Sequence, residues 1–173
     1  MHPARLAVKI QGQIEHFSGK LSAGLSVPAT RMVREVLLGI QARGSVRLSE
    51  IGRALGEDTA LKKVIERLGR HLRRREVRDK VQGNLLRLAA TTIRDETLLV
   101  VDPTDIHKPY ARQMEHLARV RDGSTGELAK GYWCCQVVGV ERDSPDVVPL
   151  YQALYSQRAP DFVSENDEIL KAC

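Results

Sequence analysis

Asp102 is the residue whose type and position point most directly to chemistry. It follows the apolar run Leu98-Leu99-Val100-Val101 and precedes Pro103. We expect a short β-strand that Pro103 ends, with both faces buried and a carboxylate at its C-terminal end. Such a carboxylate can hold Mg²⁺, which binds one or two carboxylates together with water and substrate phosphates. The alternative, which spacing alone favours, is that Asp102 only starts the turn at Pro103-Thr104.

The polar residues that follow Asp102 add little to such a site by their spacing. Asp105 either shares the site or lies in the turn, and we expect the turn. His107 and His116 are nine residues apart, which is not a metal-ligand spacing such as i, i+4, so we do not expect them to bind metal.

A run of cations between positions 62 and 75 is the second group that could do chemistry. Only Glu66 offsets them, and phosphate contact with duplex DNA is the function that we favour over an ordinary solvated helix surface. Lys130, near the turn Gly123-Ser124-Thr125-Gly126, is a further candidate for DNA contact, and surface solubility is its alternative. The cations of the run are Lys62, Lys63, Arg67, Arg70, Arg73, Arg74 and Arg75.

Helices must position the basic run. Apolar residues at helical spacing predict a helix from Val33 to Ala42, a short helix capped by Ser49 and closed by Gly56, and a helix over 61–72. The last two outline a helix-turn-helix whose second helix faces DNA. A further helix, burying Val81, Leu85, Leu86 and Leu88, leads towards Arg94.

Strands must position Asp102. Besides the strand that ends there, YWCCQVVGVE (132–141) and VVPLYQALYS (147–156) flank a turn over 142–146 and predict an antiparallel hairpin. Ser164 and Asp167 have the spacing of a capping box and open a helix. The expected fold class is α+β, with helices followed by three antiparallel strands. Three strands and a helical turn bury little, so we expect further elements to complete this sheet.

Composition limits the classes of protein to which the chain can belong. Its 173 residues carry a net charge of +5, with 42% apolar and 28% charged residues, as in globular proteins. Residues 1–97 have a net charge of +9 and residues 98–173 one of −4, which suggests a basic half that meets a polyanion. No apolar run approaches the roughly 18 residues of a membrane span, and the N-terminus has no signal-peptide core. Adjacent Cys134 and Cys135 are expected to pack in a strand, and the three cysteines make no disulfide framework, which fits the cytoplasm.

Three segments carry a family resemblance. LLVVDPTDIHKPYA, MEHLARVRDGSTGELAKGYWCCQVVGV and VVPLYQALYS resemble the start of the catalytic domain of DDE-type insertion-sequence transposases, whose core is ribonuclease H-like. The resemblance covers about residues 98–173, and residues 1–97 are similar in placement to the DNA-end-binding domain of this family. It implies cut-and-paste DNA transposition, in which three acidic residues hold two divalent metal ions, Mg²⁺ or Mn²⁺. Asp102 matches the first of these acids, which makes it the expected catalytic residue and metal ligand.

The chain departs from the family pattern in one respect. The second Asp and the Glu of the triad match no residue here, so we expect an N-terminal transposase fragment, truncated after strand three, that binds DNA without cutting it and holds no metal tightly. The implied partners are duplex DNA at transposon ends and a second copy of the chain, without a membrane, in the nucleoid of a bacterial cytoplasm. The alternative is a helix-turn-helix regulator whose β part serves dimerisation.

Overall fold

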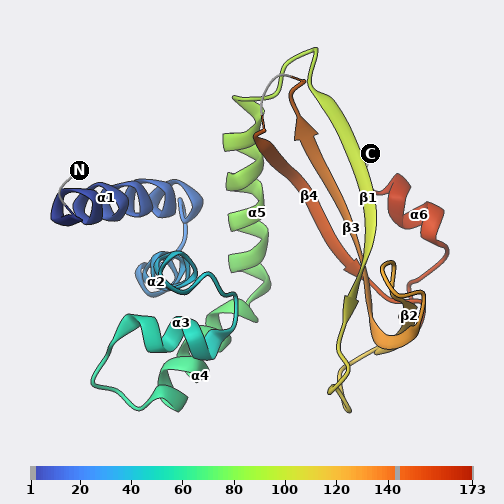
Figure 1. Ribbon diagram of the computed structural model, residues 1–173, viewed down its shortest axis with the longest axis horizontal. Helices are drawn as coiled ribbons and strands as arrows, with labels where there is room; N and C mark the ends of the chain where they lie inside the picture. The colour runs from blue at the N-terminus through green and yellow to red at the C-terminus, as the bar shows by residue number, and fades with distance from the viewer. Residues whose placement is uncertain (1–2, 143–144, 173) are drawn as a thin grey trace. The chain divides into compact units, whose positions relative to one another are not determined.

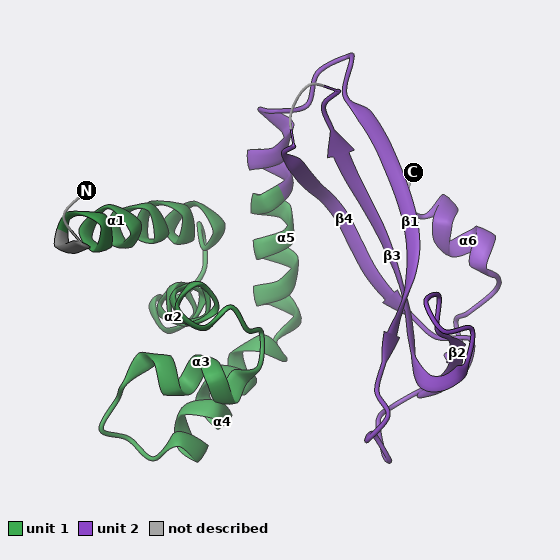
Figure 2. Cartoon of the chain, viewed as in Figure 1, with its two compact units in different colours: residues 1–85 green, residues 86–173 purple. Residues whose placement is uncertain are grey.

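The described residues fold into an α+β structure of five helices followed by a four-stranded antiparallel sheet and a sixth, short helix (Figure 1). The computed structural model describes residues 3–142 and 145–172. It divides into two compact units, residues 1–85 and residues 86–173 (Figure 2). None of the helices in these described segments has the length and apolar character needed to cross a membrane.

Helices account for nearly all of the first 90 residues. The helical periodicity predicted for the stretches around 33–42, 49–55 and 61–72 is confirmed. The helices are α1 (Pro3–Leu21), α2 (Val27–Arg43), α3 (Leu48–Leu55), α4 (Leu61–Leu72) and α5 (Arg75–Ala90).

Helices α2, α3 and α4 enclose the core of the helical unit. Met32, Ile51, Val64 and Leu68 are each at most 2% exposed. The approach of α2 to α3 requires glycine at position 39, because a Cβ there would lie 2.6 Å from Cγ2 of Ile51. Close packing of this kind holds α4 in a fixed orientation on its neighbours.

The capping residues predicted for α3 are confirmed at its C-terminal end and wrong at its N-terminal end. Gly56 follows α3 with φ 59°, in the left-handed region that favours glycine. The prediction of Ser49 as N-cap is wrong, because α3 begins at Leu48 and Arg47 is the N-cap residue. Ser45 instead accepts a hydrogen bond from the Arg47 amide (3.2 Å), so the chain turns into the helix before it reaches Ser49.

Helix α5 buries different residues from those that its apolar pattern predicted. It ends at Ala90 rather than near Arg94, and Val77, Asn84 and Ala89 are its buried side chains. Asn84 donates hydrogen bonds from Nδ2 to the carbonyl oxygens of Leu21 (2.8 Å) and Ala23 (3.0 Å). These two bonds explain the difference, because they turn the Asn84 face of α5 towards the end of α1.

The sheet is built around one long strand, β3. It pairs antiparallel with each of the other three strands. Gly131 lies opposite both His107 and Ala118, so β1 runs along one edge of β3, while β2 and β4 follow one another along the other edge. The strands are β1 (Leu98–His107), β2 (Ala118–Arg121), β3 (Leu128–Val140) and β4 (Val147–Tyr155).

The predicted antiparallel hairpin is confirmed by the pairing of β3 with β4. Of its turn, residues 143–144 lie outside the described residues. The predicted helix start at Ser164 is also confirmed, since the Asp167 amide donates to Ser164 Oγ (3.1 Å) at the start of α6 (Glu165–Leu170). The Asp167 carboxylate pairs with Lys171 (2.9 Å), so the N-cap half of the predicted capping box is the half that the structure shows. The prediction of three strands is wrong, because the four-residue strand β2 was too short to stand out in the sequence.

Candidate functional site

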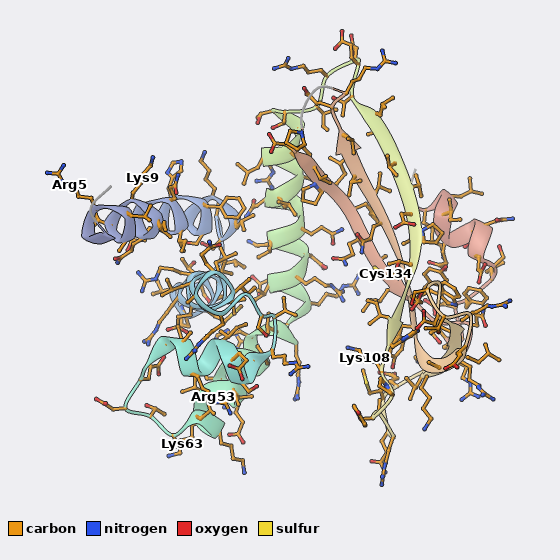
Figure 3. All side chains as sticks on the ribbon, viewed as in Figure 1. Arg5, Lys9, Arg53, Lys63, Lys108 and Cys134 are labelled. Carbon is orange, nitrogen blue, oxygen red and sulfur yellow. The ribbon has the colours of Figure 1, made fainter. Side chains whose placement is uncertain are left out.

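The predicted DNA-contacting cations of α4 and the residues after it are mostly exposed. Val64 and Leu68 form the buried face of this helix, and the cations project from the rest of its surface. Figure 3 shows Lys63 on the side of the helical unit remote from α1. No ion pair within the described residues neutralises Lys62, Lys63, Arg70, Arg73 or Arg74.

Arg67 differs from the other cations of α4. It is half-buried and pairs through Nη1 with Oε2 of Glu35 (2.6 Å) and through Nη2 with Glu57. Glu35 is 7% exposed and also pairs with Nε of Arg31 (2.5 Å). The guanidinium of Arg67 is therefore engaged inside the helical unit, where a buried carboxylate requires a partner. The DNA contact predicted for Arg67 stays a prediction, and these ion pairs make it the weakest candidate of the run.

Burial and the neighbouring cations of α4 both act on the pKa of His71. Burial is the main cause that lowers its pKa from the ordinary 6.5, and the cations Arg74, Arg70 and Arg67 lower it further, against the opposing effect of Glu35. A like charge near an imidazole disfavours its protonation. The last turn of α4 is thus a region where positive charges act on one another and on any anion that approaches.

Asp102 does not occupy the place that the sequence predicted. Strand β1 continues through Pro103 to His107, so Asp102 lies in the middle of the strand, opposite Gln136. Pro103 is tolerated because β1 is an edge strand of the described sheet, where a residue without an amide hydrogen need not break a ladder. The Asp102 side chain is exposed, so burial does not oblige it to find a cation.

The apolar residues before Asp102 are not buried on both faces, as had been expected. Leu98 is 59% exposed, Leu99 61% and Val100 44%. The buried side chains of the sheet lie on the other strands instead: Cys134 and Cys135 of β3 are 0% and 1% exposed, and Val120 of β2 is 1% exposed. Figure 3 shows Cys134 among the strands, and both residues pack, as predicted.

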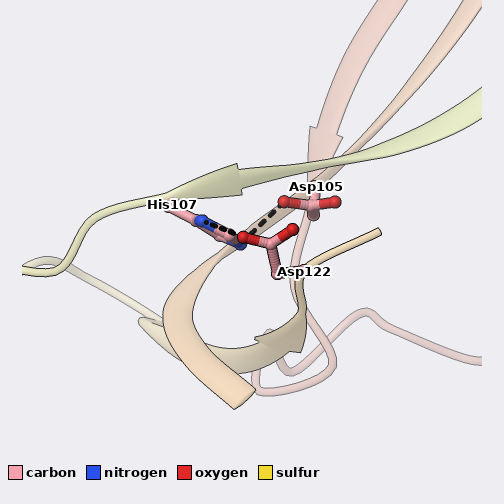
Figure 4. A group of neighbouring side chains, drawn as sticks. All are labelled: Asp105, His107 and Asp122. Atoms are coloured by element: carbon pink, nitrogen blue, oxygen red, sulfur yellow. Dashed lines mark ion pairs between the residues drawn. The ribbon is translucent and has the colours of Figure 1, made fainter. Parts of the chain in front are cut away.

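A cluster that the sequence did not reveal joins Asp105, His107 and Asp122 (Figure 4). Nε2 of His107 lies 2.7 Å from Oδ2 of Asp105, and Nδ1 lies 3.3 Å from Oδ2 of Asp122. Asp105 was expected in a turn, but it lies in β1 two residues before His107, so both side chains are on one face of the strand. Asp102 is on the opposite face by the same alternation, so it does not share this cluster.

Asp122 shows what holds the cluster together. Its Oδ1 accepts hydrogen bonds from the hydroxyl (2.5 Å) and amide (2.7 Å) of Ser124 and from the amide of Thr125 (2.9 Å). These donors, the Ser124 hydroxyl first, hold the pKa of Asp122 well below its ordinary value. The Gly123 amide also donates to Oδ1 of Asp105 (3.0 Å), which fastens the β2–β3 turn to β1.

The chemistry open to this cluster is the binding of a proton or a cation. One ligand atom from each of the three residues lies within 4.8 Å of the other two, and carboxylate with imidazole is a donor set that divalent metals accept. Hydrogen bonds already occupy Oδ1 of both carboxylates, and both ring nitrogens of His107 face carboxylates. The cluster therefore first of all braces the β2–β3 turn. The Asp-x-His spacing was its one sequence signal, since Asp122 reaches it only through strand pairing.

Comparison with known proteins adds no relative. The chain matches no protein-family model, no curated protein and no solved structure.

Proposed function

We propose that the chain binds duplex DNA through α4 and belongs to the DDE-type transposases, with a β unit of ribonuclease H-like type. The observation that carries the DNA-binding part is a set of exposed cations at α4 that form no ion pair within the described residues: Lys62, Lys63, Arg70, Arg73 and Arg74. Counterions held by DNA phosphates are released when such cations replace them, and this release drives binding.

The arrangement of α3 and α4 supports this role. The two helices are joined by residues 56–60 and pack on α2, in the order that a helix-turn-helix uses to present its second helix. Gly52 allows the close contact, because a Cβ there would lie 2.8 Å from Cδ1 of Leu61. A rigid pair of helices presents the cations of α4 without the cost of ordering the backbone on binding.

The catalytic part of the proposal rests on the resemblance and on the accessibility of Asp102. The residues present do not fit a two-metal site, because the group of three metal-ligating side chains in the described chain is Asp105, His107 and Asp122, on the other face of β1. A single carboxylate does not hold two metal ions. The function proposed for this chain by itself is thus DNA binding without strand cleavage.

Fluorescence anisotropy with a labelled duplex of about two helical turns, ~20 base pairs, tests the proposal. We expect affinity to fall by up to ~10³-fold between about 50 and 200 mM salt, if six or more phosphates are contacted. The variant Lys62→Ala/Lys63→Ala/Arg70→Ala should bind ~10²-fold more weakly, with a salt slope smaller by about 3.

A matched control removes the same residue types from α1. Arg5, Lys9 and Lys20 are exposed there, and their triple alanine variant should bind almost like the wild type. Equal losses in the two variants, or binding that does not depend on salt, would overturn the proposal. A further outcome would be that the chain nicks duplex DNA in the presence of Mg²⁺ and that Asp102→Asn abolishes this nicking. It would show that copies of the chain assemble a complete catalytic site.

One observation favours the second candidate, a regulator that dimerises through its sheet. Strand β1 has no partner on its outer edge among the described strands, and Leu98, Leu99 and Val100 are exposed on it. Such an edge readily pairs with another chain. Light scattering that shows a dimer, broken by Leu99→Lys, together with Mn²⁺ binding unaffected by Asp102→Ala, would favour the regulator.

A further inference from the structure

A pocket of about 640 Å³ lies within the β unit, on the side of β2 and the start of β3. Four cations line it: Arg112 from the loop after β1, Arg119 from β2, Lys130 from β3 and Arg158 from the segment after β4. His116 also lines it, and the other lining side chains are apolar. Strand pairing thus gathers charges that are far apart in the sequence.

The charge of this pocket is not compensated. Arg112, Arg119, Lys130 and Arg158 form no ion pair within residues 3–142 and 145–172, and no described carboxylate lines the pocket. Glu115 pairs with Nε2 of His116 (3.3 Å), but its side chain is 87% exposed and stays in water. The four cations are themselves exposed at the rim of the pocket, so water and salt weaken their mutual repulsion, and an anion that enters the pocket relieves what remains of it.

The loop that forms one wall of the pocket is held by three hydrogen bonds, which its consecutive carbonyl oxygens at residues 115–117 accept from side chains elsewhere in the unit. The Tyr132 hydroxyl donates to the Glu115 carbonyl (2.5 Å), the Ser156 hydroxyl to that of His116 (2.5 Å), and Nη1 of Arg158 to that of Leu117 (3.2 Å). The middle residue, His116, has φ 50°, in the left-handed region where side chains other than glycine are strained.

The three bonds explain how the strained residue persists. A backbone held in a sparsely populated region requires surroundings that over-determine it, and such strain gathers at ligand sites. The wall of the pocket is therefore formed before a ligand arrives, which lowers the ordering cost of binding.

We propose that this pocket binds a phosphate group of a nucleic-acid backbone. Arginine presents several N–H donors in a planar fork that matches phosphate oxygens, and charge-assisted bonds of this kind are the strong ones. The pocket is larger than one phosphate, and apolar side chains line it together with the cations, so it has room for the sugars on either side of a phosphodiester. The assignment to nucleic acid rests on the proposed function, whereas the affinity for phosphate does not.

Nuclear magnetic resonance titration of the full chain with inorganic phosphate tests the pocket directly. We expect saturable shifts of the His116 and Arg119 signals. Arg119→Ala and Lys130→Ala should each weaken binding ~10-fold, the effect of one charge-assisted hydrogen bond. Neither residue takes part in the three bonds to the loop, so these variants should fold.

Arg142→Ala is the matched control, because Arg142 is an exposed arginine of the same unit beyond the opposite end of β3. It should bind phosphate like the wild type. Shifts that do not saturate, or a loss of phosphate affinity in Arg142→Ala equal to that in the pocket variants, would overturn the proposal that this pocket binds phosphate.

A second arm uses the ~20-base-pair duplex. The double variant Arg119→Ala/Lys130→Ala should bind it more weakly, with a salt slope smaller by about 2. Phosphate binding with no change in duplex binding would identify free phosphate as the ligand and overturn the nucleic-acid assignment. If the Lys62→Ala/Lys63→Ala/Arg70→Ala variant binds DNA like the wild type, the proposed function of α4 fails. The phosphate titration of the pocket does not depend on that result.

Discussion

The chain gathers positive charge in two regions, α4 and the pocket beside β2, and it does so in different ways. The cations of α4 are close neighbours in the sequence and spread around one helix, whereas those of the pocket come from four segments and meet through strand pairing. In α4 the charges differ in use, since Arg67 is paired internally and the others are not. A count of cations therefore does not distinguish the two regions, whereas the pairing and the convergence of the cations do, and these are the properties on which both proposals rest.

The largest effect should come from the one paired cation of α4. Arg67→Ala leaves the buried Glu35 with Arg31 alone, and we expect it to lower the free energy of unfolding by about 3 kcal/mol, the lower end for breaking a buried pair. Its salt slope for DNA should not change. Arg70→Ala should do the reverse: its free energy of unfolding should stay within ~0.5 kcal/mol of the wild-type value, and the salt slope of its DNA binding should be smaller by about 1. Urea unfolding and anisotropy measure both, and identical behaviour of the two variants would erase the distinction.

The packing that presents α4 can be tested at Gly39. Gly39→Ala places a methyl group 2.6 Å from Cγ2 and 3.0 Å from Cα of Ile51, and we expect a loss of about 2 kcal/mol by overpacking. Gly12→Ala in α1 meets nothing within 4 Å and should instead stabilise the chain by about 0.5 kcal/mol. Thermal unfolding that moves both variants in the same direction would contradict the proposed tight contact.

The stability that the β2–β3 turn contributes should depend on pH, because Asp122 holds this turn. The turn joins the strands that carry Arg119 and Lys130. The pKa of Asp122 is lower in the folded chain than its ordinary 3.8, so its contribution to stability is complete above that value and is lost as the pH falls towards the folded pKa. Unfolding midpoints measured from neutral pH into acid should fall less steeply for Asp122→Asn than for the wild type. Asp161→Asn, at an exposed carboxylate, should follow the wild type, and a similar flattening in it would refute the role of Asp122.

The smallest effect on stability should come from Asp102. Its side chain is exposed in the middle of β1, so Asp102→Asn should change the free energy of unfolding by no more than ~0.5 kcal/mol. Urea unfolding beside Asp122→Asn would show whether the two acids differ as expected. A loss for Asp102→Asn as large as for Asp122→Asn would mean that Asp102 is structural.

The elements that could be predicted were those with a local cause. The helical spacing around α2 and α4, the glycine after α3 and the N-cap at Ser164 all act over a few residues, and each is found in the structure. Strand β2 was missed because four residues give too short an alternation. The end assigned to β1 was wrong because the rule for proline depends on whether the strand is at an edge.

By itself, the sequence determined the α+β order, the basic run of α4 and the antiparallel hairpin, because periodicity, turn residues and charge are local properties of a chain. Only the tertiary structure decided that Arg67 faces two carboxylates, that Asp102 is exposed and apart from the Asp105–His107–Asp122 cluster, and that four distant cations share a pocket. The physical reason is that ion pairs and binding sites depend on distances of a few ångströms between side chains. Strand register and helix packing set those distances between residues that are far apart in the sequence.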